Sequence, residues 1–165
     1  MKFYLEKLNI TSIIEGGGVN KLLSFYYRHR KDLLGVKLGF SIPLNVADMG
    51  LSIAHVGPII INSGAHIGRY CRIHVGVNIG TELGFNDHAP IIGNNVFISP
   101  GVKVFGSIKI EDDVVIGANA VVNKSILEKN ICVAGVPAKK ISERGRRNIQ
   151  QEKELVEEFE RIFIR

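Results

Sequence analysis

The sequence predicts an all-β fold, a parallel β-helix of six-residue repeats with short helices at its two ends. Three observations predict it: an aliphatic residue recurs every six positions, a second apolar residue follows most of these by four positions, and 165 residues contain 18 glycines but no tryptophan. An α-helix would need a period of 3.6 and a half-exposed strand a period of 2. A chain that turns a corner every six residues and stacks its turns as parallel strands explains the period.

The aliphatic anchors form two series separated by one break. They are Ile61, Ile67, Ile73 and Ile79, and then Ile92, Ile98, Val104, Ile110, Ile116 and Val122. The residues four positions after an anchor are small or branched: Ala65, Cys71, Val77, Val96, Val102, Ile108, Val114, Ala120 and Ile126. Stacked coils hide their strand edges and need caps at both ends. We expect a domain of residues 40–141 with roughly five coils.

The two ends of the chain read as helices. Residues 1–39 predict an N-terminal helical cap, because residues 19–34 mix apolar and basic side chains as a basic amphipathic helix does. Residues 142–165 predict a C-terminal helix, because apolar residues recur at helical spacing in a strongly charged segment. We expect its apolar stripe to pack on the domain or on a neighbouring subunit.

The repeat breaks between Ile79 and Ile92, which stand 13 positions apart. The intervening residues are rich in Gly, Asn, Asp and Pro, so residues 81–91 predict an extruded surface loop, a place where solenoids commonly carry function. His88 lies in this loop beside Asp87 and is a candidate acid or base at neutral pH. A solvated loop histidine is the alternative interpretation.

Composition limits the possible partners. The net charge of +5 permits an anionic partner, but apart from residues 26–31 the basic residues form no block interleaved with aromatic ones, which disfavours nucleic acid. No signal peptide and no long apolar stretch is apparent, so we expect a cytoplasmic protein. Cys71 and Cys132 lack metal or disulfide spacing and are expected in the core. The scattered histidines predict no metal site.

Five segments together carry a family resemblance. They are Ser-Ile-Ala-His-Val-Gly at residues 52–57, the loop that ends in His88 and Pro90, the segments 98–108 and 114–122, and Ala-Gly-Val-Pro-Ala at residues 134–138. In this order, across residues from about 40 to 141, they resemble the serine acetyltransferase branch of the hexapeptide-repeat acyltransferases. The resemblance implies a left-handed β-helix that transfers an acetyl group from acetyl-CoA.

The same resemblance implies the catalytic residues. His55 matches the family's general base, and His88 matches a second histidine that binds or orients the acceptor. His55 also holds an anchor position, six residues before Ile61, so a core or capping role remains the alternative. His66 and His74 have no family counterpart, and we expect them to face outward or to be structural. The candidates for binding the acceptor are Asn78, Glu82 and Asp87.

A groove between stacked coils is implied for coenzyme A, with backbone groups along the pantetheine arm and basic side chains at the phosphates. The candidates are Ser99, Gly117, Ala118, Lys124, Ala134, Gly135, Pro137, Lys139 and Lys140. The further basic residues Arg144, Arg146 and Arg147 follow directly.

The chain also departs from the family pattern. Ala54 and Phe40 stand where the family has acidic residues, and Asp87 stands where it usually has arginine. In the family, the acidic residues at the positions of Ala54 and Phe40 orient the histidine and meet the amino group of serine. Because this chain lacks them, we expect a neutral sugar hydroxyl as the acceptor, in capsule or exopolysaccharide biosynthesis. The partner that orients His55 would then be a backbone carbonyl or another acid, such as Glu82 or Asp87.

Two alternatives to a sugar acetyltransferase remain open, namely a serine O-acetyltransferase of cysteine biosynthesis and a non-catalytic β-helix assembly module. About 40 residues replace the family's long helical N-terminal domain, so we expect a plain homotrimer. Its active sites would lie between subunits, with His55 and His88 from different chains. The basic N-terminal helix leaves contact with an anionic membrane surface open.

Overall fold

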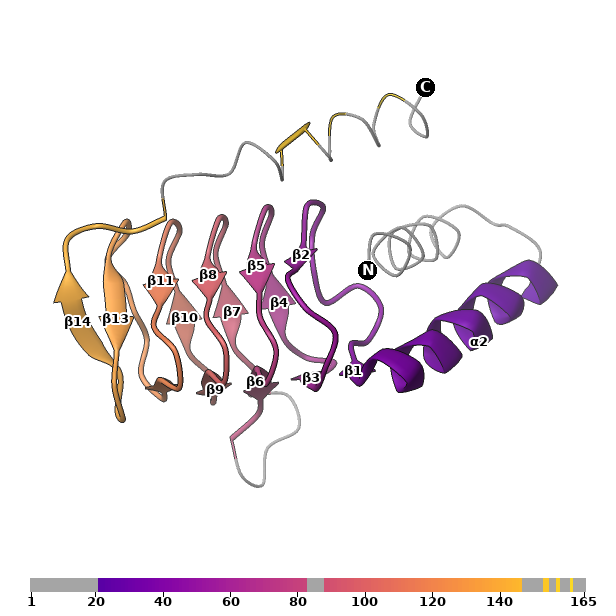
Figure 1. Ribbon diagram of the computed structural model, residues 1–165, viewed down its shortest axis with the longest axis horizontal. Helices are drawn as coiled ribbons and strands as arrows, with labels where there is room; N and C mark the ends of the chain where they lie inside the picture. Colours follow the sequence, from indigo (N-terminus) through magenta and orange to yellow (C-terminus); the bar gives the residue numbers. More distant parts are fainter. Residues whose placement is uncertain (1–20, 83–87, 147–152, 155–156, 158–160, 162–165) are drawn as a thin grey trace.

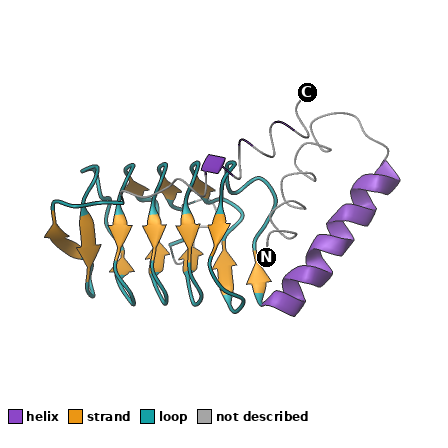
Figure 2. Cartoon of the chain, turned by 45° about the horizontal axis from the view of Figure 1, so that its top comes forward, coloured by secondary structure: helices purple, strands orange, loops and turns teal. Residues whose placement is uncertain are grey.

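The computed structural model describes residues 21–82, 88–146, 153–154, 157 and 161. These residues form a stack of coils with a helix, α2 (Lys21–Leu38), at one end (Figure 1). Each coil contributes short strands to three sheets that run along the stack (Figure 2). Within these sheets neighbouring strands are parallel, apart from the last pair, β13 and β14. The parallel β-helix predicted from the period of six is confirmed.

We call the three faces sheets A, B and C. Sheet A contains β1 (Phe40–Ser41), β3 (Ile59–Ile61), β6 (Asn78–Gly80), β9 (Lys103–Phe105) and β12 (Val121–Val122). Sheet B contains β4 (His66–Ile67), β7 (Ile91–Ile92) and β10 (Lys109–Ile110). Sheet C contains β2 (Ser52–Ile53), β5 (Arg72–Ile73), β8 (Phe97–Ile98), β11 (Val115–Ile116), β13 (Cys132–Ala134) and β14 (Lys139–Ser142).

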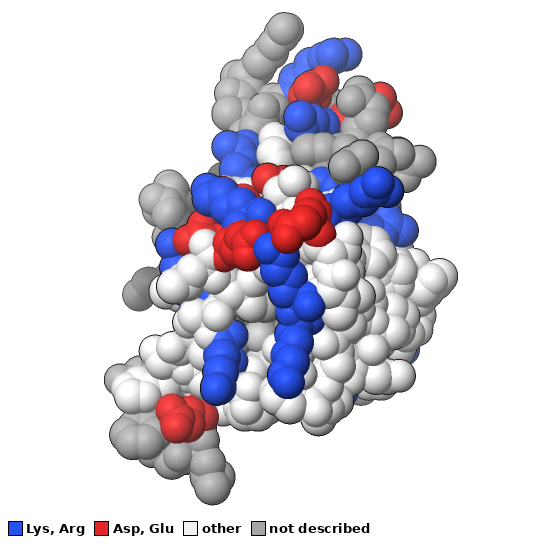
Figure 3. Space-filling model, turned by 90° about the vertical axis from the view of Figure 1, so that its left-hand side faces the viewer, with Lys and Arg blue, Asp and Glu red and all other residues white. Residues whose placement is uncertain are grey.

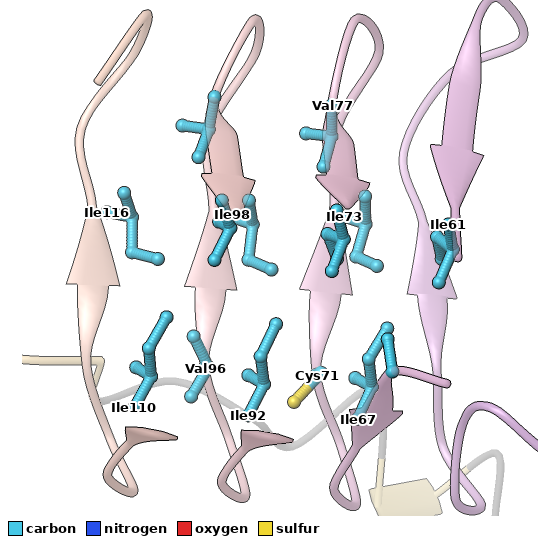
Figure 4. Close-up of a cluster of buried hydrophobic side chains, with 14 of the residues drawn as sticks. Ile61, Ile67, Cys71, Ile73, Val77, Ile92, Val96, Ile98, Ile110 and Ile116 are labelled. Carbon is cyan, nitrogen blue, oxygen red and sulfur yellow. The ribbon is translucent and has the colours of Figure 1, made fainter. Parts of the chain in front are cut away.

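The core runs along the axis of the stack. The anchors Ile73, Ile98 and Ile116 are register partners on successive strands of sheet C, and all three are fully buried. Figure 4 shows these residues stacked with their counterparts from the other faces. Full burial of one such side chain contributes about 1.5–3 kcal/mol. Cys71 is buried in the same core, as predicted, and Cys132 is half-buried.

The corners depend on residues that tolerate a left-handed backbone. At the corner before sheet C, Tyr70, Asn95, Asp113 and Asn130 all have a φ between 55° and 61°. At the corner after sheet C, Gly101 has a φ of +75°, and a Cβ there would lie 2.0 Å from Oδ1 of Asn119 in the next coil. Positive φ and close stacking explain the many glycines and asparagines.

The N-terminal end of the stack is covered by the second half of α2. Leu34 and Leu38 pack against the core, and the buried Lys31 donates a hydrogen bond of 3.5 Å to the carbonyl oxygen of Ile42. The helix extends to Leu38, beyond the predicted end near Leu34, because its last turn still contacts the first coil. Residues 1–20 of the predicted cap lie outside the described residues. None of the helices in the described ranges is long and apolar enough to cross a membrane.

The C-terminal end differs from the prediction. The chain pairs as strand β14 up to Ser142, and residues 143–146 are not helical. These residues run back across a corner of the stack, where the backbone N–H of Arg146 donates to the carbonyl oxygen of Asp113 (3.0 Å). Helix is assigned at residues 153, 154, 157 and 161. The other residues of the predicted C-terminal helix, Arg147 included, lie outside the described part of the chain.

Candidate active site

His55 lies at the corner between sheets C and A, two residues after β2, and its side chain is exposed. Ile53 and Ile73 are register partners, and the N–H of Ala54 donates to the carbonyl oxygen of Ile73 (3.1 Å). Ala54 and His74 therefore occupy the same position on neighbouring strands. The imidazole rings of His55 and His74 lie 5.8 Å apart between centroids, tilted by 58°.

His74 lies beside His55 on the outer face of sheet C, in agreement with the outward-facing or structural role that the sequence indicated. Its ring also packs on Phe97, with 5.0 Å between centroids. Burial lowers the pKa of His74, and the nearby Arg72 and His55 lower it further. Nε2 of His74 is buried, with no hydrogen-bond partner among the described groups. The period of six did not reveal this contact: Ile53 and Ile73 stand 20 positions apart, which is not a multiple of six, so the strand register alone places Ala54 beside His74.

The loop histidine is far from His55 within one chain. His55 precedes β3 and His88 follows β6, and these neighbouring strands pair in parallel, so one histidine lies at the amino end and the other at the carboxyl end of the strands of sheet A. Residues 83–87, which include Asp87, lie outside the described residues. At the base of this loop the N–H of Glu82 donates to the carbonyl oxygen of His88 (3.3 Å).

The other candidates for the acceptor site are on sheet A and its loop. Asn78 lies in β6 and is half-buried, with Lys103 as its register partner on β9. Glu82 is exposed, near His88 rather than near His55. Neither residue is placed beside His55 in the chain, so any orienting role of Glu82 would require a second subunit.

Three of the residues predicted to bind coenzyme A form one row along sheet C. Ser99, Gly117 and Ala134 each follow a register partner of sheet C, and the backbone pairs them directly: Ser99 N–H donates to Ile116 O (3.1 Å) and Gly117 N–H to Val133 O (2.8 Å). A Cβ on Gly117 would lie 2.9 Å from Cβ of Ala134. Ala54 and His74 occupy the same position on the two preceding strands of sheet C. The row of Ser99, Gly117 and Ala134 therefore extends from them toward the last coil.

The loop at the end of this row packs on β12. Val121 N–H donates to Gly135 O (3.0 Å), and Ala138 N–H donates to Val121 O (2.8 Å). The backbone on both sides of Pro137 is therefore hydrogen-bonded to β12. The exposed Ala118 lies at the same corner. Lys124 does not join them, because it lies at the opposite end of β12, at the corner that leads to sheet B.

The predicted phosphate-binding lysines differ in their surroundings. Lys139 is exposed, whereas Nζ of Lys140 pairs with the carboxylates of Glu128 and Glu143, the latter at 2.8 Å. Figure 3 views this end of the molecule and shows basic and acidic side chains meeting there. The carboxylates that neutralise Lys140 make Lys139 the better candidate for a phosphate. In the described residues no group of three or more His, Cys, Asp or Glu side chains could hold a metal ion.

Comparison with known proteins places this geometry in context. The pattern of the bacterial transferase hexapeptide (six repeats) matches residues 89–124. A serine acetyltransferase from Staphylococcus epidermidis is 39% identical over 98 residues, which are 59% of this chain and 46% of that protein. One from Synechococcus elongatus is 35% identical over 97 residues, which are 58% of this chain and 39% of that protein. The match thus spans less than half the length of these relatives.

Solved structures give the same result. Serine acetyltransferase from Brucella abortus in complex with coenzyme A aligns with a TM-score of 0.69 and 26% identity, covering 86% of this chain and 56% of that one. Serine acetyltransferase from Neisseria gonorrhoeae aligns with a TM-score of 0.69 and 26% identity, covering 88% and 55%. The chain is therefore a left-handed parallel β-helix of transferase hexapeptide repeats that resembles the serine acetyltransferases.

Proposed function

We propose that this chain is an O-acetyltransferase that moves an acetyl group from acetyl-CoA to a hydroxyl, with His55 as the general base. The observation that carries the proposal is the position of His55. Its exposed imidazole lies at a coil corner, and the row of Ser99, Gly117 and Ala134 begins two strands further along sheet C, beyond His74. A thin pantetheine arm fits along such a row, and its thioester would then approach the histidine.

The chemistry requires a base because an alcohol is a weak nucleophile. In the proposed step, a ring nitrogen of His55 takes the hydroxyl proton while the hydroxyl oxygen attacks the thioester carbonyl carbon. The carbon–sulfur bond then breaks, and coenzyme A leaves as a thiolate that receives the proton from His55. Backbone N–H groups at the coil corners are suitable donors for the negative carbonyl oxygen. A positioned base of this kind typically contributes about 10²–10⁴-fold to the rate.

The acceptor is the open part of the proposal. The relatives reported above are serine acetyltransferases, so they favour L-serine, the alternative, over the sugar hydroxyl expected from the sequence. One observation still favours a sugar. Ala54 precedes His55, and Phe40 is buried in the core, so neither position offers a carboxylate for an amino group. We retain the sugar as the second candidate.

The same geometry supports a homotrimer as part of the proposal. Because His55 and His88 lie at opposite ends of the strands of sheet A, a single chain does not bring them together. A neighbouring subunit, packed against the corner after sheet C, would bring its own His88 to His55. The proposed active site is then shared, and complementation tests this directly. Mixed trimers of His55→Ala and His88→Ala chains would regain activity, whereas each variant alone would be inactive.

The first experiment measures the loss of acetyl-CoA by liquid chromatography, a readout that the protein's own thiols do not disturb. L-serine and a panel of sugars and nucleotide-sugars serve as acceptors, with His55→Ala as the test variant. His66→Ala is the matched control, because His66 is an exposed histidine on sheet B that pairs with Asp48 at 3.6 Å. Turnover that is lost in His55→Ala and kept in His66→Ala supports the proposal. Wild-type protein that neither turns over nor binds acetyl-CoA would favour a non-catalytic assembly module.

A further inference from the structure

Three aromatic rings follow one another along the outer face of sheet C. His55 lies after β2, His74 directly after β5, and Phe97 in β8, so the rings come from three successive coils. The centroids of His55 and His74 are 5.8 Å apart, and those of His74 and Phe97 are 5.0 Å apart. His74 thus lies between the proposed base and a hydrophobic ring that fixes its position.

The residue before His55 cannot orient it, because the side chain of Ala54 is a methyl group. A catalytic histidine normally has a partner that holds its ring and stabilises the imidazolium. The side chain next to Ala54 in the register of sheet C is His74. The structure therefore offers an imidazole beside the position that lacks a carboxylate.

His74 is suited to this role by its protonation state. Burial lowers its pKa, and the positive charges of Arg72 and of protonated His55 act in the same direction. Arg146 lies over Phe97, with its guanidinium carbon 5.8 Å from the ring centroid. His74 is thus neutral at physiological pH, with one nitrogen as donor and one as acceptor.

One nitrogen of the His74 ring lacks a hydrogen bond within the described residues. Its Nε2 is buried and has no partner there. Leaving a buried polar nitrogen unpaired is energetically unfavourable. The centroid of this ring lies 5.8 Å from that of the exposed His55, and an unpaired buried nitrogen so close to the proposed base indicates a partner that arrives during function.

We propose that His74 is the positioning residue of His55, and that its free ring nitrogen accepts a hydrogen bond from His55 when His55 takes the proton of the acceptor hydroxyl. This inference rests on the proposed function. The proton stays on His55 until the thiolate of coenzyme A receives it, so His74 is unchanged at the end of the reaction. The positive charge of Arg72 disfavours a second imidazolium, so the pair carries one positive charge rather than two.

The first test needs no acceptor. NMR of the imidazole nitrogens follows the hydrogen bonding of the His55 ring in the wild type and in His74→Phe, which keeps an aromatic ring on Phe97 but has no ring nitrogen. We expect the loss of the acceptor nitrogen to shift the resonance of a ring nitrogen of His55 in the variant. His66→Phe, with its change on sheet B, is the matched control and leaves the His55 resonances unchanged. Unchanged His55 resonances in His74→Phe overturn the inference. Should this variant not fold, His74→Leu takes its place.

The second test is kinetic, with whichever acceptor shows turnover. We expect His74→Phe to lower kcat about tenfold or more, to leave KM for acetyl-CoA unchanged, and to move the acidic limb of the pH profile of kcat/KM. His74→Gln offers an acceptor oxygen and should recover part of kcat. Wild-type kinetics in His74→Phe overturn the inference and leave the proposed function standing. Shifted His55 resonances without turnover on any acceptor support the coupling of the two histidines and overturn the proposed function instead.

Discussion

The guanidinium of Arg146 donates a hydrogen bond of 2.6 Å to the carbonyl oxygen of Tyr70, a residue 76 positions earlier in the chain. The same guanidinium lies over the ring of Phe97, and the side-chain amide of Asn95 reaches the carbonyl oxygen of Arg146 at 3.5 Å. Only 8% of Arg146 is exposed. Through its side chain and its carbonyl oxygen, Arg146 thus connects the segment after β14 to several coils.

Replacing Arg146 should therefore destabilise the coil stack. Arg146→Ala removes a hydrogen bond from a charged donor, a type of bond worth about 1.5–3 kcal/mol, and we expect the free energy of unfolding to fall by about 2–3 kcal/mol. Urea denaturation measures the change. Arg144→Ala is the control, because that side chain is exposed, and it should change stability by less than about 0.5 kcal/mol. Equal losses of stability in the two variants would contradict a stabilising role of the Arg146 side chain.

Ile91 and Ile92 are neighbours in β7, but they face opposite sides of sheet B. Ile91 is 52% exposed, whereas Ile92 is 1% exposed. We expect Ile92→Ala to cost about 2–5 kcal/mol, because it leaves a cavity in the stacked core. Ile91→Ala should cost less than about 1 kcal/mol in the isolated chain. Thermal or urea unfolding distinguishes the two, and similar losses would show that the register of β7 is wrong.

Cys71 should be chemically inert in the folded protein. Burial raises the pKa of its thiol to about 12, and its Sγ donates to the carbonyl oxygen of Gly93 (3.2 Å). The thiolate is the reactive form, so very little of it exists at pH 8. In a Cys132→Ser variant, which leaves Cys71 as the remaining thiol, a disulfide reagent should label the protein only after denaturant is added. Rapid labelling in native buffer would contradict the burial of Cys71.

Stability should depend on pH through His74. Because the pKa of His74 is lowered in the folded state, the unfolded chain binds more protons once the pH falls below about 6.5, so the free energy of unfolding decreases toward pH 5. Above that range His74 contributes no pH dependence. His74→Gln should flatten the curve between pH 7 and pH 5, as measured by urea denaturation at each pH.

His66→Gln is the control for this prediction. Its ring is exposed and faces Asp48, which is also exposed. The carboxyl groups of Glu111 and Asp112, whose pKa values are lowered mainly by hydrogen bonds to Lys109 and Lys129, titrate in both variants and cancel in the comparison. A His74→Gln curve that keeps the full wild-type slope would show that His74 titrates normally.

The sequence by itself determined the β-helix, because a side chain placed inside every six residues leaves few other folds. It also determined which residues form the core, since anchors such as Ile73, Ile98 and Ile116 are read directly from the period. The break in the period located the loop that carries His88. These features are local or strictly repetitive, and so they need no knowledge of long-range contacts.

Only the tertiary structure decided what depends on contacts between distant residues. The helical pattern after residue 142 gave no sign that β14 and Arg146 fold back on the coils, because their partners Asp113 and Tyr70 are far away in sequence. The pairing of Lys140 with Glu128 and the remoteness of Lys124 from Gly117 likewise follow from how the corners stack. The contact of His74 with His55 is of the same kind. Ring positions depend on how neighbouring coils pack, and the chain order of the residues does not specify that packing.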